Sequence, residues 1–368
     1  MKRILHIVGT MDRAGAETMV MNLYRAIDKS KYQFDFVYFT DKKCAYDDEI
    51  LALGGRIYKI PKRYKQKPIT RTFKLYQLIK KNKPFHAIHC HQLLSNSFHL
   101  IAGYFAGMSK RIVHAHSTRD FSKQNVIRKL YQNFSKKIIH ILGTDFIACG
   151  IEPGNFLFPN KKNIVFIPNA IDVDKFLVAK TKRDVDFFKI KKDKHTIMIS
   201  QIGRFMTVKN HEFSIKFAQY LKKQNFNFHM FFAGSGTLEN EMKTLTKELD
   251  IMDKITFLGV REDIDAILGN SDLLLMPSIY EGFPVILVES QTAGTPALIS
   301  NGIVKEVDLG LDLVTFCNLD EPFKKWMDYI NTILKLPIKN NQLRYKTISE
   351  RGFNINISVN FLEKVYNN

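Results

Sequence analysis

Short apolar runs alternate with longer segments of helical periodicity along this chain, and this alternation constrains the fold more than any other feature. The apolar runs, rich in Ile, Val, Leu and Phe, predict strands at residues 4–8, 34–39, 57–60, 87–89, 112–114, 146–149, 165–167, 196–202, 228–233, 255–258, 273–276, 297–300 and 313–316. Helical patterns lie between them near residues 15–28, 70–81, 94–107, 122–140, 209–224, 237–249, 263–269, 284–294 and 321–335. Strands and helices that alternate in this way are typical of parallel sheets covered by helices on both faces. The sequence therefore predicts an α/β protein.

A polar segment, residues 172–194, contains no predicted strand and separates two such series. At 368 residues the chain is long enough for two domains of roughly 150 residues each. We therefore expect two Rossmann-like, doubly wound domains, at residues 1–175 and 176–352, that face one another across a cleft. In such sheets ligands bind beyond the carboxyl ends of the strands, so the strand-to-helix turns are the places to search.

Positive charge is concentrated in one region of the chain. The 55 lysines and arginines outnumber the 36 acidic residues and give a net charge of +19. Between residues 50 and 144 a single acidic residue, Asp120, stands against nineteen basic ones, so this stretch carries nearly the whole excess. Such an excess predicts an anionic partner for the N-terminal half, and nucleic acid, a membrane surface and a phosphorylated substrate are the candidates.

Cysteine spacing and hydropathy indicate in which cellular compartment the protein is expected. Cys44, Cys90, Cys149 and Cys317 lie far apart without a CxxC pair, which favours a reducing compartment over a zinc site or a disulfide framework. The apolar N-terminal segment is too short for a signal peptide, and no run of about 18 apolar residues occurs. We therefore expect a cytoplasmic protein that is peripheral if it associates with a membrane.

Two strand-to-helix turns carry features that suit phosphate. Gly15 opens the helix that follows the first strand, and a glycine there lets a phosphate approach the free backbone N–H groups. Arg204 and Lys209 follow the strand at 196–202 and precede a helix, and such a pair of cations suits a diphosphate. The alternatives are a turn glycine and two solvated surface cations.

The segment from Met276 to Ser290 contains two glutamates, Glu281 and Glu289. Pro284 fits a first helical position, which leaves Glu281 on the entering loop and places Glu289 inside an apolar helix. A carboxylate in such surroundings needs a partner because burying an unpaired charge is costly, and the hydroxyls of a polar ligand would serve. The alternative is a capping Glu281 and a salt-bridged Glu289.

In their order along the chain, these motifs resemble those of the retaining glycosyltransferases of family 4, which have the GT-B fold. The resemblance covers nearly the whole chain and includes Val165-Phe166-Ile167-Pro168-Asn169-Ala170-Ile171-Asp172, Gly203-Arg204 with Lys209, Phe231-Phe232-Ala233-Gly234-Ser235-Gly236, Phe257-Leu258-Gly259 and the two glutamates. Two positions depart from the family, because Ala14 and Ala170 stand where many relatives have glycine. Ala170 would be strained if its position required a positive φ.

The resemblance implies a role for each residue of a donor site. Arg204 and Lys209 would bind the donor diphosphate and stabilise it as leaving group, Glu289 would hold the ribose hydroxyls, and Glu281 would hold hydroxyls of the transferred sugar. The other expected donor-binding residues are Gly15, which would let its loop close over the phosphates, Gly203, Gly234, Val260 with Arg261 near the base, and Gly282, Phe283 and Pro284 around the sugar.

Histidines cluster in the N-terminal half. His116 matches the family's histidine near the donor sugar. His114 is the other residue that could be this match, and a purely structural role for the histidine is the further alternative. His89 and His91 share a strand face and could ligate zinc, but no third ligand stands at a familiar spacing. The resemblance likewise implies a donor site in which Arg204 and Lys209 replace a cation. We therefore expect no metal and no cofactor, and we expect His91 to face the acceptor.

The implied reaction moves a hexose or N-acetylhexosamine from a nucleotide diphosphate sugar, expected to be a UDP-sugar, to a lipid-linked saccharide, with a polyprenyl-diphosphate-linked or another saccharide as the acceptor. This reaction would belong to the synthesis of bacterial capsule or exopolysaccharide. No motif supplies an obvious enzyme nucleophile, and the resemblance implies retention by front-face attack. A nucleotide-sugar epimerase or a phosphorylase of the same fold is the alternative enzyme. A nucleic-acid-binding protein is the alternative from another class, but it leaves the balanced C-terminal half and its glutamates unexplained, so we expect no nucleic acid partner.

The basic N-terminal domain would then be the acceptor domain. Its loop at 59–67 and its predicted helix at 70–81 mix cations with aromatic and aliphatic residues, which suits an anionic bilayer. A merely solvated basic face is the alternative. We expect a peripheral protein on the inner face of the cell membrane. The resemblance also implies that the end of the chain, residues 353–368, packs back on this domain.

Overall fold

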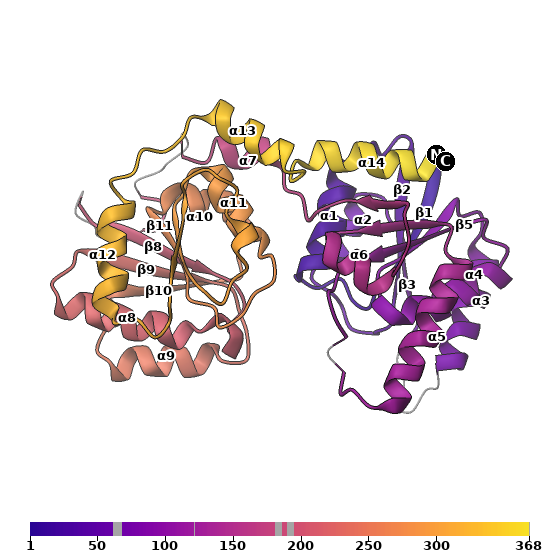
Figure 1. The fold of residues 1–368 in the computed structure, drawn as a ribbon, viewed down its shortest axis with the longest axis horizontal. Coiled ribbons are helices and arrows are strands. Elements are labelled where there is room, and N and C mark those ends of the chain that lie inside the picture. The colour runs from indigo at the N-terminus through magenta and orange to yellow at the C-terminus, as the bar shows by residue number, and fades with distance from the viewer. Residues whose placement is uncertain (62–67, 121, 181–185, 190–194, 368) are drawn as a thin grey trace. The chain divides into compact units, whose positions relative to one another are not determined.

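The computed structural model describes residues 1–61, 68–120, 122–180, 186–189 and 195–367, and Figure 1 shows its fold. The chain divides into two compact units. The N-terminal unit comprises residues 1–170 together with the last helix, and the C-terminal unit comprises residues 171–354. The divisions expected from the sequence, after residues 175 and 352, lie a few residues away from these. Each unit is a parallel α/β sheet of its own.

The N-terminal unit contains a seven-stranded parallel sheet with the order β3-β2-β1-β4-β5-β6-β7. Its strands are β1 (Lys2–Ile7), β2 (Tyr32–Tyr38), β3 (Ile57–Lys59), β4 (Ala87–Cys90), β5 (Lys110–Ala115), β6 (Asp145–Ala148) and β7 (Ile164–Phe166). Its helices are α1 (Gly15–Ala26), α2 (Asp47–Ala52), α3 (Pro68–Asn82), the 3-10 turn η1 (Leu93–Ser95), α4 (Asn96–Phe105), α5 (Val126–Leu142), α6 (Ile151–Leu157) and α14 (Ile355–Asn367). The strand order reverses at β1 and β4, as in doubly wound folds.

The C-terminal unit repeats this plan with a six-stranded parallel sheet in the order β10-β9-β8-β11-β12-β13. Its strands are β8 (Ile197–Ile202), β9 (Phe228–Ala233), β10 (Ile255–Gly259), β11 (Leu273–Met276), β12 (Ala297–Ser300) and β13 (Val314–Cys317). Its helices are α7 (Val173–Leu177), η2 (Thr207–Lys209), α8 (His211–Lys223), α9 (Glu239–Glu248), η3 (Met252–Lys254), α10 (Ile264–Asn270), α11 (Val285–Ala293), η4 (Lys305–Val307), α12 (Phe323–Ile333) and α13 (Asn341–Glu350). Here the order reverses at β8 and β11.

Both faces of each sheet are buried, which is why the strands read as nearly continuous apolar runs. In the N-terminal unit, successive residues of one strand enter different cores: Ile4 belongs to one cluster and Leu5 to the other. The C-terminal unit also has two large cores, and Trp326, the only tryptophan, is fully buried in one of them. None of the described helices is both long and apolar enough to cross a membrane.

The end of the chain is part of the N-terminal unit. Helix α14 contacts α1, and its Leu362 and Tyr366 are fully buried in the same core as Ile4. Lys2 donates to the side-chain oxygen of Asn367 at 2.8 Å, so the two termini lie side by side (Figure 1). Strand β1 and helix α14 thus complete this unit from opposite ends of the sequence.

All of the strands predicted from the sequence are present, with ends shifted by at most two residues, and the predicted helices are present as well. The short helices α2, α6 and α7 and the polar helix α13 were not predicted. Pro284 is the residue before α11 and has an extended ψ of 118°, so the prediction that it is the first helical residue was wrong. Ala170 is not among the residues with positive φ, so this departure from the family causes no backbone strain.

Candidate active site

Glycines bring two loops together at the carboxyl edge of the C-terminal sheet. Gly203 follows β8 and Gly234 follows the neighbouring strand β9, and Gly203 N–H donates to the carbonyl of Ala233 at 2.9 Å. A Cβ added to Gly234 would lie 2.1 Å from the carbonyl oxygen of Gly203, and Gly234 has a φ of +142°. Only glycine fits such a position. A Cβ would overlap the backbone of Gly203, and the positive φ would strain the backbone of any other residue. The close approach fixes the loop that carries Arg204.

An ion pair lies beside these loops. Lys209, at the end of η2, and Glu281, on the loop after β11, approach to 2.6 Å between Nζ and Oε1. Each side chain is 19% exposed, so the pair is half-buried and open to a ligand. Arg204 is exposed and forms no hydrogen bond or ion pair with the described residues. The structure thus brings Lys209 and Glu281 together and leaves the Arg204 guanidinium available.

Backbone contacts hold both members of the pair in place. The side chain of Gln201 donates to the carbonyl of Lys209 at 2.9 Å. Asn210 adopts a left-handed conformation with φ of +55°, and its side-chain amide donates to the carbonyl of Pro277 at 3.0 Å. The N–H of Glu281 donates to the carbonyl of Gly302 at 3.2 Å. The loops after β8, β11 and β12 are therefore joined, and the ion pair stands on a fixed base.

The residues after Glu281 lead directly into α11. Gly282 is exposed, and a Cβ added to it would meet no atom within 4 Å. Phe283 stacks on Phe353 with ring centroids 5.0 Å apart, and Pro284 is buried. This anchoring keeps open space over Gly282 at the N-terminus of a helix, where the backbone dipoles favour negative charge.

Glu289 lies one turn inside α11. Burial raises the pKa of this carboxyl to about 7, while Lys175 lowers it and Asp265 raises it further. Lys175 and Asp265 form their own ion pair at 2.9 Å. Glu289 is therefore a carboxyl group in apolar surroundings without a cation of its own, and hydrogen bonds from a ligand's hydroxyls would stabilise its charged form.

The position expected near a base follows β10. Val260 is 54% exposed, and Arg261 forms an ion pair with Asp263. Every donor-binding residue expected from the second half of the chain thus lies at or after the carboxyl ends of β8, β9, β10 and β11, where doubly wound sheets bind ligands. The arrangement offers cations for a diphosphate and carboxylates for hydroxyl groups.

The N-terminal unit has its own set of candidate residues. Gly15 is the first residue of α1, and the nearest atom to an added Cβ would be the Asn169 amide nitrogen, 4.0 Å away. Near it is a cavity of about 490 Å³, with Gly9, Glu17 and His91 in its lining. The open space at a helix start agrees with the expectation that a phosphate can approach there.

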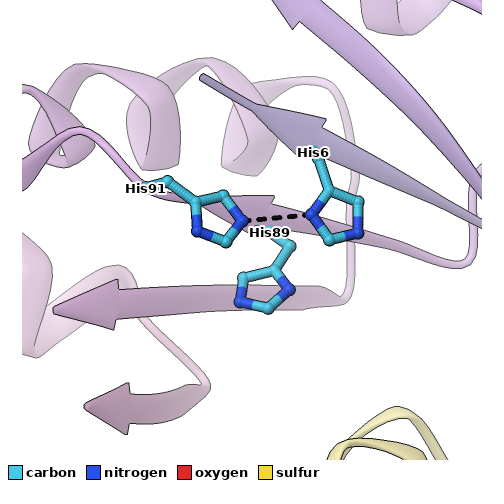
Figure 2. Close-up of side chains that lie close together, drawn as sticks. All are labelled: His6, His89 and His91. Atoms are coloured by element: carbon cyan, nitrogen blue, oxygen red, sulfur yellow. Dashed lines mark hydrogen bonds between the residues drawn. The ribbon is translucent and has the colours of Figure 1, made fainter. Parts of the chain in front are cut away.

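Five histidines gather at the carboxyl ends of β1, β4 and β5, namely His6, His89, His91, His114 and His116. Parallel pairing places His6 beside His89, and Figure 2 shows His6, His89 and His91 converging. His6 Nδ1 lies 3.0 Å from His91 Nε2, and His91 Nδ1 lies 2.9 Å from His116 Nε2. His6 is a neighbour that sequence reasoning missed, because more than eighty residues separate it from His89.

The environment keeps these rings neutral. Burial lowers the pKa of His116 to about 4, and it lowers the pKa values of His6, His89, His91 and His114 well below the usual range for histidine. His114 is fully buried, whereas His116, just beyond β5, is partly exposed. Of the two histidines that the sequence offers for this position, His116 is the one that a ligand can reach.

Comparisons with known proteins fit this geometry. Residues 13–175 match the family described as Glycosyltransferase Family 4, and residues 182–349 match the family described as Glycosyl transferases group 1. The putative glycosyltransferase EpsF of Bacillus subtilis is 36% identical over 370 residues, covering 100% of this chain and 96% of that protein. An Escherichia coli UDP-Gal:alpha-D-GlcNAc-diphosphoundecaprenol alpha-1,3-galactosyltransferase is 28% identical over 62% of this chain and 60% of its own.

The fold has solved counterparts. A crystal structure of Anabaena HepE in complex with UDP-glucose matches with a TM-score of 0.73 over 100% of both chains, at 14% sequence identity. The two family matches, the relative that spans nearly the whole chain and the paired doubly wound units lead to one assignment. This chain belongs to the glycosyltransferases of family 4 and group 1, and its architecture is the GT-B fold.

Proposed function

We propose that this glycosyltransferase transfers a hexose or N-acetylhexosamine from a UDP-sugar to a lipid-linked saccharide during the synthesis of a cell-surface polysaccharide. The observation that carries the proposal is the Lys209–Glu281 ion pair beside the unpaired Arg204, at the strand ends where nucleotides bind. The names of the relatives support the substrates. One acts on a UDP-Gal donor and a diphosphoundecaprenol-linked acceptor, and one structural neighbour holds UDP-glucose.

In the proposed mechanism the cations act on the leaving group. Arg204 and Lys209 neutralise the charge that develops on the diphosphate as the bond to the sugar breaks, a form of stabilisation that is strongest for charges fixed in advance. The Lys209 contact turns the Glu281 carboxylate toward the same place, where it accepts hydrogen bonds from the sugar hydroxyls. Glu289 accepts those of the ribose. The role of His116 toward the donor sugar is the one that the family resemblance implies.

Retention of the anomeric configuration and a donor site without metal are parts of the same proposal. Two basic side chains, Arg204 and Lys209, provide the positive charge that a divalent cation gives a diphosphate elsewhere. Apart from Glu281, which the cation holds, the described loops after β8 and β11 offer no carboxylate that could act as a nucleophile. We therefore assign deprotonation of the acceptor to the departing diphosphate, on the same face of the sugar. The α-1,3 product named for one relative is in line with this assignment.

A donor panel tests the proposed function. The chain is incubated with UDP-, GDP- and ADP-sugars, each with and without a polyprenyl-diphosphate-linked saccharide, in buffer without added magnesium or manganese. We expect a UDP-sugar to be consumed at least about tenfold faster than the others and its sugar to appear on the acceptor with an α linkage. Consumption that yields an epimer of the donor and no glycosylated acceptor would identify an epimerase instead.

We also propose that the N-terminal unit binds an anionic membrane surface through α3 and α5. Helix α5 has no acidic residue, and it carries a row of exposed apolar side chains, with exposed fractions given in parentheses: Val126 (73%), Ile127 (78%), Leu130 (64%), Phe134 (48%) and Ile141 (60%). Lys129 and Lys137 are exposed beside them. Apolar residues flanked by lysines are typical of helices that lie in the membrane interface.

Helix α3 extends this surface. It lacks acidic residues too, exposes Ile69 and Phe73, and carries Lys80 and Lys81 in its last turn. Helices α3, α4 and α5 pack side by side over the second core of the N-terminal sheet. The sequence alone predicts membrane binding by residues 59–67 and 70–81. Residues 62–67 lie outside the described part of the chain, and α5 is not part of that prediction.

Changing the apolar row of α5 tests this surface. The double substitution Ile127→Glu with Leu130→Glu is expected to lower partitioning onto anionic liposomes by at least about tenfold, because it removes apolar area from the lipid and adds repulsion. Sedimentation with vesicles of mixed neutral and anionic lipid measures the partitioning. Ile151→Glu, at an equally exposed isoleucine in α6 of the same unit, is the matched control and should change it little. Equal binding of all three proteins would exclude α5 as the membrane surface.

A further inference from the structure

The histidine cluster of the N-terminal unit has more buried nitrogen atoms than hydrogen-bond partners. His89 Nε2, both ring nitrogens of His114 and His116 Nδ1 are buried and have no hydrogen-bond partner among the described residues. No aspartate or glutamate forms an ion pair with any of these five histidines in the described part of the chain. Buried polar atoms in native proteins nearly always have a partner, so this cluster requires an explanation.

Three of the histidines have the arrangement of a metal site. His6, His89 and His91 each offer one ring nitrogen, and these three atoms lie within 4.8 Å of one another. Zinc binds histidine at roughly 2.0–2.1 Å, so two nitrogen ligands of a tetrahedral ion lie roughly 3.3 Å apart. His6 Nδ1 and His91 Nε2 are already separated by 3.0 Å (Figure 2). This separation differs by only about 0.3 Å from the spacing of two nitrogen ligands on one tetrahedral ion.

The surroundings hold the rings as a metal site requires. A metal-bound histidine nearly always donates its other ring N–H to an acceptor, which fixes the ring and its tautomer. The hydroxyl oxygen of Tyr366 lies 3.0 Å from His89 Nδ1 and 3.5 Å from His6 Nε2. A hydroxyl oxygen has two lone pairs, so it can accept from both rings. The last helix of the chain therefore supplies the support for two of the three candidate ligands.

The third ligand connects the cluster to solvent. His6 and His89 are fully buried, whereas His91 is partly exposed and lines the cavity of about 490 Å³ together with Glu17 and Gln92. Three protein ligands with a fourth position open to a cavity are the pattern of sites that keep a water or a substrate on the metal. The cavity also provides a route by which an ion can enter.

We propose that His6, His89 and His91 bind a divalent transition-metal ion of the zinc class, with its fourth position open to this cavity. When Nε2 of His91 binds the ion, its proton lies on Nδ1 and is donated to Nε2 of His116, 2.9 Å away. The ion would thereby fix the tautomer of His116. The importance of the His116 tautomer rests on the proposed function. Metal binding itself does not depend on that function, nor on the metal-free donor site proposed for the other unit.

Metal titration of the full-length, untagged chain tests the proposal. After removal of metal with a chelator and dialysis, cobalt(II) is added as a spectroscopic probe and zinc is added to displace it. We expect one ion per chain, the visible absorption of tetrahedral cobalt, and a higher melting temperature with zinc. His6→Gln and His89→Gln should abolish these effects. Tyr366→Phe should weaken binding by about 10- to 100-fold, as is usual for residues that orient a metal ligand.

Two further variants keep the test decisive. His91→Asn changes the partly exposed ligand and is used if the buried variants fail to fold, as judged by circular dichroism. His99→Gln, at a buried histidine of the same unit that stacks on Phe39, is the matched control and should bind like the wild type. Absence of stoichiometric binding in the wild type overturns the proposal. Binding that survives His6→Gln and His89→Gln but is lost in His114→Gln also overturns it, because His91, His114 and His116 form a second close triad.

Discussion

Lys209→Ala is expected to lower the rate of sugar transfer by about 10²- to 10³-fold without unfolding the chain, which is the usual effect of removing one fixed group that stabilises transition-state charge. The side chain is half-buried, and its ammonium group forms an ion pair with Glu281 at 2.6 Å. Steady-state transfer with a UDP-sugar measures the loss, and it should appear in kcat because the charge on the diphosphate develops as the bond breaks.

Glu281→Ala should cause a loss of similar size, and the double variant should lose much less than the product of the two single effects, because one partner positions the other. The matched control is Lys216→Ala. Lys216 pairs with Glu212 at the same distance, 2.6 Å, but both side chains are about half exposed on the surface of α8. That variant should retain full activity. Wild-type turnover by Lys209→Ala would contradict the assigned donor site.

Gly234→Ala is expected to destabilise the C-terminal unit by about 3 kcal/mol or more, through backbone strain and a steric clash. The added Cβ would lie 2.1 Å from the carbonyl oxygen of Gly203, and neither backbone segment can move without breaking the hydrogen bonds that join the loops after β8, β9 and β10. Urea unfolding followed by tryptophan fluorescence measures the effect, since Trp326 is buried in a core of this unit.

Gly282→Ala provides the comparison. Its added Cβ would meet no atom within 4 Å, and its φ is not in the positive range, so the free energy of unfolding should change by less than about 0.5 kcal/mol. Equal stability of the two variants would show that the loops after β8 and β9 can separate at little cost. The close approach at Gly234 would then not be what fixes Arg204.

Much of the fold could be predicted because parallel strands buried on both faces leave a strong apolar signal. The unpredicted elements lack such a signal. Helix α6 contains Pro153 and Gly154, which read as a turn, yet the proline lies in the first helical turn where no N–H is needed, and an added Cβ on Gly154 would approach Ala148 to 3.3 Å. In the polar helix α13 the buried residues are Arg344 and Ile348, so its apolar stripe is too narrow to recognise.

The candidate site was predictable as a set of residues but not as a set of contacts. The sequence places Lys209 and Glu281 after two predicted strands, but only the structure shows that these strands are neighbours, and the ion pair also depends on loop conformations such as the left-handed Asn210. His6 joins His89 only through the register of β1 on β4. The outer face of α5 was missed because an amphipathic pattern shows that one side of a helix is apolar without showing which side meets the core.

The position of α14 has a consequence for the order in which the protein can fold. The N-terminal unit needs Leu362 and Tyr366 to fill its core, yet the ribosome makes these residues only after the whole of the C-terminal unit. The C-terminal unit is continuous in sequence and can complete its core without residues made later. The N-terminal unit, whose synthesis begins before that of the C-terminal unit, is thus completed after it, and a chain released before α14 is made cannot complete the core around its histidines.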